Sequence, residues 1–333
     1  MSHANISVFV PHLGCPNRCS FCDQVTISGA DSQPTAEDVD NAVRLAMTSS
    51  RFEPKNTELA FFGGSFTAID KEYMIELLSA ARYHIEQGNI CGIRISTRPD
   101  CIDNGVLDIL KQYGVTAIEL GAQSMCDDVL LANNRGHTAE DVRVASKLIK
   151  EYGFELGLQM MTGLYKSTYE KDILTAEEII KCDPQTVRIY PSITLKNTRL
   201  AKLFESGEYI PPTLDATVIL CVQLLRMFEK AKINVIRTGL HSIDNDRYVA
   251  GPWHPSFREL CDSRMYFEKI VKMLPEKGEY KLLVNPREIS KVVGNKRSNI
   301  DSLNSLGYKC TVVGDDSVLP SNIKVERMNN SCF

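Results

Sequence analysis

The stretch His12-Leu13-Gly14-Cys15-Pro16-Asn17-Arg18-Cys19-Ser20-Phe21-Cys22-Asp23 governs the interpretation of the whole chain. Its three cysteines have the spacing C-x3-C-x2-C and directly follow the apolar run 6–10, which predicts a loop leaving a strand. Zinc sites usually combine two Cys-x-x-Cys pairs, or cysteine with histidine, and a second pair is missing here. Clustered thiolates hold [4Fe–4S] clusters, and three of them leave one iron open. We interpret Cys15, Cys19 and Cys22 as ligands of such a cluster; the alternatives are a zinc loop or free buried cysteines.

The composition is that of an ordinary globular protein. The chain has 333 residues, of which 43% are hydrophobic and 24% charged. It contains no run of eighteen apolar residues that could span a membrane, and Met1-Ser2-His3-Ala4-Asn5 does not begin a signal peptide. Eleven cysteines, an odd number in a long chain without a signal, indicate a reducing compartment, so we expect a cytoplasmic protein. The net charge of −4 confines any nucleic-acid surface to a local patch.

Short apolar runs alternate with amphipathic stretches along most of the chain. The predicted strands are 6–10, 58–62, 93–97, 115–120, 155–161 and 186–191, and the predicted helices between them are 35–49, 71–87, 103–113, 138–152 and 167–182. Thr35 with Asp38 and Thr138 with Asp141 have the capping-box spacing at a helix start, and Gly114 and Gly153 suit helix ends. Six strand–helix units in series predict a parallel sheet with right-handed crossovers.

Two parallel architectures fit this order: a doubly wound sheet and a barrel. No G-x-G-x-x-G follows the first strand, and the conspicuous motifs fall at the carboxyl ends of successive strands, which is the rule for barrels. These motifs are Phe61-Phe62-Gly63-Gly64-Ser65-Phe66-Thr67, Ser96-Thr97-Arg98-Pro99-Asp100, Glu119-Leu120-Gly121-Ala122-Gln123-Ser124 and, shortly after, Asn134-Arg135-Gly136-His137-Thr138.

With the cysteine loop, these motifs resemble the radical SAM superfamily. The last three blocks are similar to the Glu-Thr-Arg-Pro-Asp, Gly-(Val/Ala)-Gln-Ser and Asn-Arg-Gly-His-Thr blocks of the Elongator catalytic subunit and its single-chain prokaryotic relatives. A broader likeness extends to anaerobic coproporphyrinogen oxidases, and the resemblance covers roughly residues 5–265. It implies an α/β partial (β/α)6 barrel. It also implies a [4Fe–4S] cluster on Cys15, Cys19 and Cys22 that binds S-adenosylmethionine (SAM) and is reduced by flavodoxin or ferredoxin.

The resemblance also assigns contacts to SAM. It places main-chain oxygens of Gly63-Gly64-Ser65 on the amino group, and Gln123 and Arg135 on the methionyl and ribose portions. Further contacts fall to Gln159, where porphyrinogen oxidases carry a ribose-binding Asp, and to Ser96, which stands where the relatives carry Glu. A hydroxyl makes fewer and weaker bonds than a carboxylate. Phe21 is either the adenine-side aromatic or a packing residue of the loop.

The carboxyl-terminal part changes character. We expect the barrel over 1–240, including a further strand from Asn234, an extension or linker over 241–280, and a small α+β domain over 281–333. The last region reads as strand, helix, Gly294-Asn295-Lys296-Arg297 turn, helix and strand, which resembles a minimal KH module with its nucleotide-clamping GXXG loop. Lys296 and Arg297 would then contact phosphates; the alternative is a cap with a solvated basic face. His254, in Gly251-Pro252-Trp253-His254-Pro255, would line the substrate mouth of the barrel or be a surface histidine.

The expected function is therefore radical SAM chemistry on RNA, such as a tRNA. After residue 266 only 67 residues follow, too few for the acetyltransferase domain of Elongator relatives. A small-molecule substrate, by analogy to the porphyrinogen oxidases, is the second hypothesis. A non-catalytic metal-binding protein that binds RNA is the third.

Overall fold

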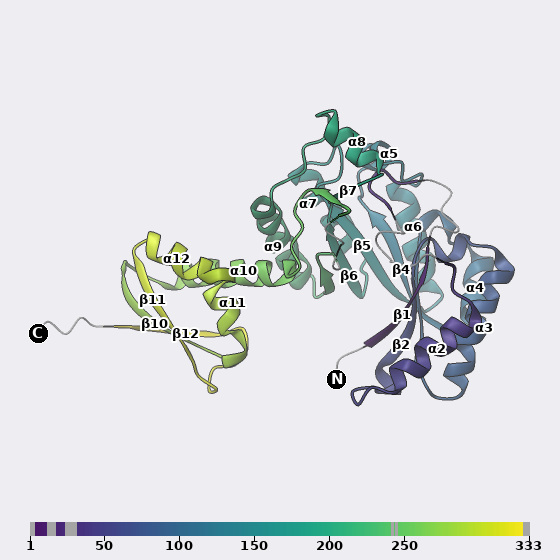
Figure 1. Cartoon of the computed structure of the whole chain (residues 1–333), viewed down its shortest axis with the longest axis horizontal. Helices are drawn as coiled ribbons and strands as arrows, with labels where there is room; N and C mark the ends of the chain where they lie inside the picture. Colours follow the sequence, from purple (N-terminus) through teal and green to yellow (C-terminus); the bar gives the residue numbers. More distant parts are fainter. Residues whose placement is uncertain (1–3, 12–17, 24–31, 241–242, 244–245, 329–333) are drawn as a thin grey trace, which may run out of the picture. The chain divides into compact units, whose positions relative to one another are not determined.

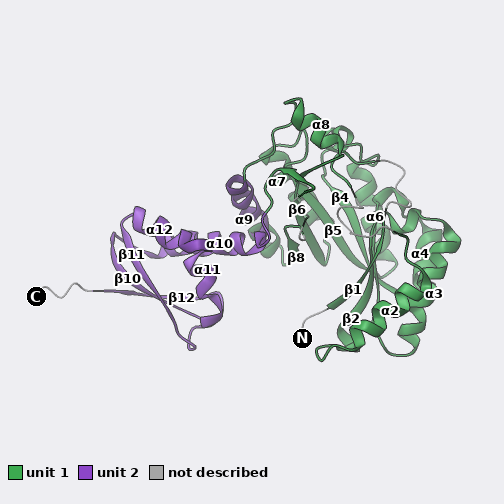
Figure 2. Cartoon of the chain, in the orientation of Figure 1, with its two compact units in different colours: residues 1–213, 226–253 green, residues 214–225, 254–333 purple. Residues whose placement is uncertain are grey.

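The computed structural model describes residues 4–11, 18–23, 32–240, 243 and 246–328. The chain divides into two compact units (Figure 2). Unit 1 comprises residues 1–213 and 226–253, and unit 2 comprises residues 214–225 and 254–333. Within the described ranges, no helix is both long and apolar enough to cross a lipid bilayer.

Unit 1 is built on a seven-stranded parallel sheet. Its strands are β1 (Ala4–Val10), β2 (Thr57–Gly63), β3 (Gly92–Thr97), β4 (Val115–Gln123), β5 (Glu155–Thr162), β6 (Thr186–Pro191) and β8 (Asn234–Thr238). They follow one another in chain order across the sheet, without the reversal that a doubly wound sheet requires. The sheet curls as an open barrel wall (Figure 1). All six predicted strands, the further strand from Asn234 and the α/β partial-barrel class are confirmed.

The helices that connect these strands also match the predicted stretches. They are α2 (Ala36–Met47), α3 (Lys71–Glu86), α4 (Asn104–Gln112), α6 (Ala139–Glu151) and α7 (Tyr169–Lys181). Thr35 and Thr138 form the predicted capping boxes, with their backbone N–H groups donating to Asp38 and Asp141 at 2.8 and 2.7 Å. Gly114 adopts φ +83°, which a residue with a Cβ rarely tolerates at a helix end. In Figure 1 these helices line the outside of the curled sheet.

The remainder of unit 1 forms the rim of the sheet. It contains the short helix α5 (Asp127–Ala132), the helix α8 (Arg199–Glu205) and a small antiparallel pair, β7 (Thr194–Leu195) with β9 (Tyr248–Ala250). Helix α9 (Leu214–Lys230) precedes β8 and belongs partly to each unit. Between the layers lie fully buried side chains such as Leu59, Phe61, Ile93 and Ile118. These residues follow the apolar runs from which the strands were predicted.

Unit 2 carries a small mixed sheet. Helix α10 (Phe257–Met273) leads into β10 (Gly278–Val284), α11 (Ile289–Val293), α12 (Ser298–Ser305), β11 (Tyr308–Gly314) and β12 (Ile323–Arg327). Strand β10 is central, parallel to β11 and antiparallel to β12. The predicted strand–helix–helix–strand order is present. Helix α10 and β12 were not anticipated, and α10 supplies Tyr266 and Ile270 to the same core as Tyr280.

Candidate functional site

The cysteine loop is fastened to the rim of the barrel at Ser20. The buried Ser20 hydroxyl donates to Asn133 Oδ1 at 2.6 Å, and its backbone N–H donates to Asn133 O at 3.0 Å. The Ser20 carbonyl in turn accepts from the Leu200 N–H at 2.7 Å. The loop is thereby held by the end of α5 and the start of α8. Cys19 and Cys22 flank this anchor, whereas Cys15 lies outside the described residues.

Phe21 packs into the same rim. Its ring lies against two small apolar clusters, one containing Val129, Met161 and Leu164 and the other containing Leu200, Leu203 and Tyr209. These contacts give Phe21 a packing function in the loop. Its contact with adenine stays a prediction.

Arg135 connects the cysteine loop to the sheet. Its guanidinium donates from Nη1 to Cys19 Sγ at 3.1 Å and from Nη2 to Gly121 O at 2.6 Å. The backbone carbonyl of Arg135 accepts a hydrogen bond from Arg98, which is itself held by both oxygens of Asp100 at 2.9 Å. Charge-assisted donors of this kind stabilise negative charge on their acceptor. The position beside Cys19 therefore suits a thiolate that binds a metal.

The end of β4 holds buried polar atoms that lack partners. The β4–β5 register shifts between Gly121 and Gln123, and Gln123 adopts φ +64°. Among the described residues, neither Gln123 Oε1 nor Arg135 Nε has a hydrogen-bond partner. Each such orphan costs about 1–3 kcal/mol, and in a native structure it calls for an explanation. A polar ligand beside the cysteine loop would satisfy them, so these residues fit SAM.

His137 lies in the same block as Arg135. Its Nε2 is 3.2 Å from Ala122 O, and its buried Nδ1 has no partner among the residues that the structure describes. Burial and the neighbouring Arg135 charge lower the pKa of His137 to about 4. The imidazole is therefore neutral at pH 7.

The glycine motif joins the ends of three strands. Gly63 adopts φ +113°, and a Cβ there would lie 2.8 Å from Val10 O. Gly64 N–H donates to the same carbonyl at 2.8 Å, while Ser65 Oγ lies 2.8 Å from Thr97 Oγ1. Close approach to β1 thus explains glycine at position 63. Bonding of the SAM amino group by this motif stays a prediction.

Ser96 and Gln159 are brought together on the inner face of the sheet. Gln159 Nε2 lies within hydrogen-bond distance of Ser96 Oγ, at 3.3 Å, and of Glu119 Oε2, at 2.9 Å. The amide thus joins the two positions that the resemblance singled out. The same amide also contacts Glu119, which was not predicted to be a site residue.

A buried charge network was missed by the sequence analysis. Glu119 is 1% exposed and accepts from Arg188 Nη2 at 2.8 Å, with Arg94 Nη1 at 3.5 Å. Arg94 also pairs with Glu58 at 2.8 Å and with Glu155 at 3.1 Å. A signal was available, because Arg94, Glu119 and Arg188 each stand between two apolar residues within a predicted strand. In a half-buried strand this pattern places the charge on the face opposite to the helices.

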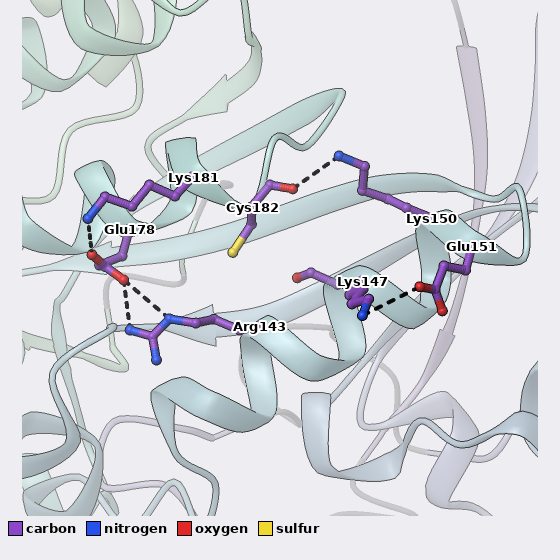
Figure 3. A pocket seen from close by; sticks show the side chains of 8 residues that line it. Arg143, Lys147, Lys150, Glu151, Glu178, Lys181 and Cys182 are labelled. Atoms are coloured by element: carbon purple, nitrogen blue, oxygen red, sulfur yellow. Dashed lines mark hydrogen bonds and ion pairs between the residues drawn. The ribbon is translucent and has the colours of Figure 1, made fainter.

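A cavity of about 560 Å³ lies away from this site, beside α6 and α7 (Figure 3). Its basic side chains are neutralised locally: Arg143 and Lys181 pair with Glu178 at 2.7 and 2.6 Å, and Lys150 pairs with Asp183. None of the predicted site residues lines it. It carries no functional assignment.

The predicted substrate residues lie in unit 2. Lys296 and Arg297 are exposed on the turn Asn295–Arg297 between α11 and α12, with φ +50° and +68°. His254 Nε2 is 3.4 Å from Asn295 Nδ2, and His254 Nδ1 accepts from Ser256 N–H at 3.1 Å. His254 thus contacts the same turn. Its place at the barrel mouth stays a prediction.

Comparison with known proteins agrees with this geometry. The radical SAM superfamily model matches residues 9–179, and the radical SAM C-terminal domain model matches residues 184–266. A tRNA uridine(34) acetyltransferase from Dehalococcoides mccartyi is 26% identical over 62% of this chain and 52% of its own length. Elongator complex protein 3 from Danio rerio is 30% identical over 62% of this chain and 41% of its length. The chain therefore spans about half the length of these relatives.

Solved structures show the same fold. An archaeal Elp3 from Methanocaldococcus infernus superposes with a TM-score of 0.63 at 22% identity, covering 81% of this chain and 64% of that one. SuiB from Streptococcus suis, solved with S-adenosylmethionine, gives a TM-score of 0.52 at 15% identity, covering 72% of this chain and 51% of that one. With the superfamily model covering half of the sequence, the chain belongs to the radical SAM superfamily of enzymes.

Proposed function

We propose that this enzyme cleaves SAM reductively and modifies RNA, with a tRNA-like molecule as its substrate. The observation that carries the SAM part is the position of Arg135. Its guanidinium spans from Cys19 Sγ to Gly121 O, beside the orphaned Gln123 Oε1. A charged fork beside a ligand cysteine suits recognition of the SAM carboxylate.

The residues would divide the work as follows. Cys15, Cys19 and Cys22 would hold the cluster, while Gln123 and Arg135 would bind and orient SAM. When bound, the cluster and SAM would supply the radical chemistry that abstracts hydrogen from an unactivated C–H bond, using an electron from flavodoxin or ferredoxin. Phe21, which packs into the rim, would help to exclude water from the reacting atoms.

The RNA part is supported by unit 2. Lys296 and Arg297 occupy left-handed backbone conformations that are uncommon outside glycine, and such outliers cluster at functional sites. Both side chains are exposed, whereas the nearby Lys291 and Lys281 are paired with Asp262 and Glu326 at 3.1 and 3.9 Å. No carboxylate among the described residues pairs with Lys296 or Arg297, and exposed cations of this kind suit phosphate contacts. The relatives include an enzyme named for acetylating tRNA uridine 34.

The test is reductive SAM cleavage by the anaerobically reconstituted enzyme, with and without candidate tRNA. Transfer of deuterium from site-labelled RNA into 5′-deoxyadenosine would support the proposal. If deuterium is transferred into 5′-deoxyadenosine from a labelled small molecule but not from labelled RNA, that molecule replaces RNA as the proposed substrate. A protein that carries iron but does not cleave SAM under reducing conditions would contradict the catalytic assignment.

A further inference from the structure

Two arginines face each other across the edge of the barrel sheet. In the parallel register of β6 and β8, Arg188 is paired directly with Arg237. Such partners lie on the same face of a sheet, and like charges placed opposite one another are destabilising. The two positive charges repel each other, and neutral residues at these positions would avoid that repulsion.

The two arginines differ in their neutralisation. Arg188 is 11% exposed, and Glu119 lies 2.6 Å from it. Arg237 is half-buried, and its guanidinium donates from Nε to Gly239 O, at 3.2 Å. Among the residues that the structure describes, no carboxylate pairs with Arg237, and the charged or titratable groups that act on it are Tyr190 and Arg188. Burial, with the adjacent Arg188 charge, lowers the pKa of Arg237 below its ordinary value.

The side chains around Arg237 are those expected of an anion-binding site. Tyr190, two residues beyond Arg188 on the same face of β6, interacts with both arginines. The Arg188 guanidinium stacks over the Phe62 ring at 5.1 Å from its centroid, which fixes its plane. Guanidinium groups bind carboxylate and phosphate oxygens through charge-assisted, often paired hydrogen bonds. The phenol of Tyr190 adds a further O–H donor.

The site also lies in line with the cofactor residues. The register pairs Gly121 with Gln159, Gln159 with Arg188, and Arg188 with Arg237, so one row crosses β4, β5, β6 and β8. Gly121 O accepts from Arg135, which touches Cys19. At about 4.8 Å per strand, Arg237 lies roughly 14 Å along the sheet from Gly121. A molecule held at Arg237 would face the SAM-binding end across the interior of the sheet.

We propose that Arg237, together with Arg188 and Tyr190, binds an anionic group, carboxylate or phosphate, of the molecule on which the enzyme acts. This inference rests on the proposed function, since it assumes that the substrate lies opposite SAM. It assigns Arg237 as the primary contact, because Arg188 is already committed to Glu119. The anionic group would cancel the repulsion between the two arginines.

The test measures anion-dependent thermal stabilisation of the reconstituted full chain. Sodium phosphate and, separately, sodium acetate are titrated against sodium chloride at matched ionic strength, in the wild type, Arg237→Gln, Arg237→Lys and the control Arg51→Gln. Arg51 is an exposed turn residue, so Arg51→Gln measures the effect of removing one positive charge elsewhere on the surface. We expect a saturable stabilisation in the wild type and in Arg51→Gln. Apparent affinity should weaken about tenfold or more in Arg237→Gln and less in Arg237→Lys.

The anion that gives the larger saturable shift distinguishes a phosphate from a carboxylate. Repeating the titration with saturating SAM distinguishes the sources of the anion: an unchanged shift supports a substrate site. A shift abolished by SAM would assign the arginines to the SAM carboxylate and overturn the proposal. Equal stabilisation of the wild type and Arg237→Gln, or none beyond chloride in the wild type, would overturn it as well. None of these outcomes depends on RNA turnover, so failure here is separable from failure of the RNA proposal.

Discussion

Ser20 and Asn133, 113 residues apart in the chain, are joined by a side-chain hydrogen bond of 2.6 Å and a backbone hydrogen bond of 3.0 Å. Asn133 also donates from Nδ2 to Val129 O and Tyr165 O, both at 2.8 Å. One buried amide therefore organises the support of the cysteine loop. The described part of the loop, between Cys19 and Cys22, is therefore part of the barrel rim.

Replacing Ser20 with Ala should loosen this support. Asn133 Oδ1 would lose its donor while staying buried, at a cost of about 1–3 kcal/mol. Chemical denaturation of the full chain should show this loss, and the iron retained after desalting should decrease. The exposed Ser50→Ala is the matched control. Unchanged stability and iron content in Ser20→Ala would show that the loop is held without this bond.

The cysteines provide a direct test of the ligand assignment. Cys15→Ala, Cys19→Ala or Cys22→Ala should each remove the cluster absorbance and SAM cleavage together, because each supplies one thiolate. Cys126→Ala and Cys261→Ala should keep both, since these buried cysteines lie outside the C-x3-C-x2-C motif. Full iron content in Cys19→Ala would refute the assignment.

Arg135→Ala should weaken SAM binding with little change in iron content. A lost charge-assisted hydrogen bond of roughly 1.5–3 kcal/mol corresponds to about tenfold or more in affinity. Calorimetric titration of the reconstituted protein measures it, with the exposed Arg143→Ala as control. Equal SAM affinity in the two variants would leave Arg135 a structural link between Cys19 and Gly121.

Strands and helices could be predicted because they depend on local sequence patterns. Apolar runs and capping pairs such as Thr138 with Asp141 located the strands and helices of unit 1, because these signals lie within a few residues of each other. The motif residues Arg135, Gln123 and Gly63 were located by resemblance, and the structure places Arg135 on Cys19.

The features that could not be predicted depend on contacts between residues that are far apart in the sequence. The contacts of Glu119 with Arg188 and of Arg94 with Glu58 join residues 69 and 36 positions apart, and only the register of the sheet creates them. Strand β12 was missed because its segment is short and mostly exposed, so it has no apolar run. It becomes a strand by pairing with the buried β10.

The protonation of His137 should make stability depend on pH with a predictable sign. In the unfolded chain the imidazole titrates near its ordinary value of 6.5, whereas in the folded protein its pKa is about 4. The unfolded state therefore binds more protons between these values, and stability is lost as the pH falls from about 6.5 to 4. The effect is at most about 3 kcal/mol. The groups that set it are Arg135, Arg98 and Asp100, besides burial.

Denaturation across this pH range should give His137→Gln a shallower loss of stability than the wild type. Asp172→Asn should change the pH profile in the opposite direction, because burial raises the pKa of Asp172 to about 6. As the pH falls below about 6, the Asp172 carboxylate is protonated in the folded state before it is protonated in the unfolded state. Its contribution to stability therefore increases as the pH falls. Parallel pH profiles for His137→Gln and the wild type would show that folding does not lower the pKa of His137.

The turn Asn295–Arg297 is the part of unit 2 that we expect to contact RNA. The buried Asn299 amide holds it by donating to Ser263 O, Lys291 O and Val292 O at 2.9–3.2 Å. Gly294 precedes it with φ +83°, where a Cβ would lie 2.6 Å from Ser298 Oγ. This framework fixes the turn and leaves the side chains of Lys296 and Arg297 exposed. Arg297 stands where a GXXG loop has its second glycine, so its long side chain either contacts phosphate or obstructs the backbone of the nucleotide.

The double variant Lys296→Glu with Arg297→Glu separates these two outcomes. If the turn binds RNA, affinity should fall, and the salt slope should decrease by up to about 0.7 for each lost contact to a single strand. The control reverses two exposed lysines on the strands of the same unit, Lys309→Glu with Lys324→Glu, and matches the change in net charge. SAM cleavage without RNA should be the same in both variants, because the cysteines belong to unit 1. If both variants bind RNA equally well, with equal salt slopes, Lys296 and Arg297 do not contact phosphate, and the substrate of the barrel has to be sought among small molecules.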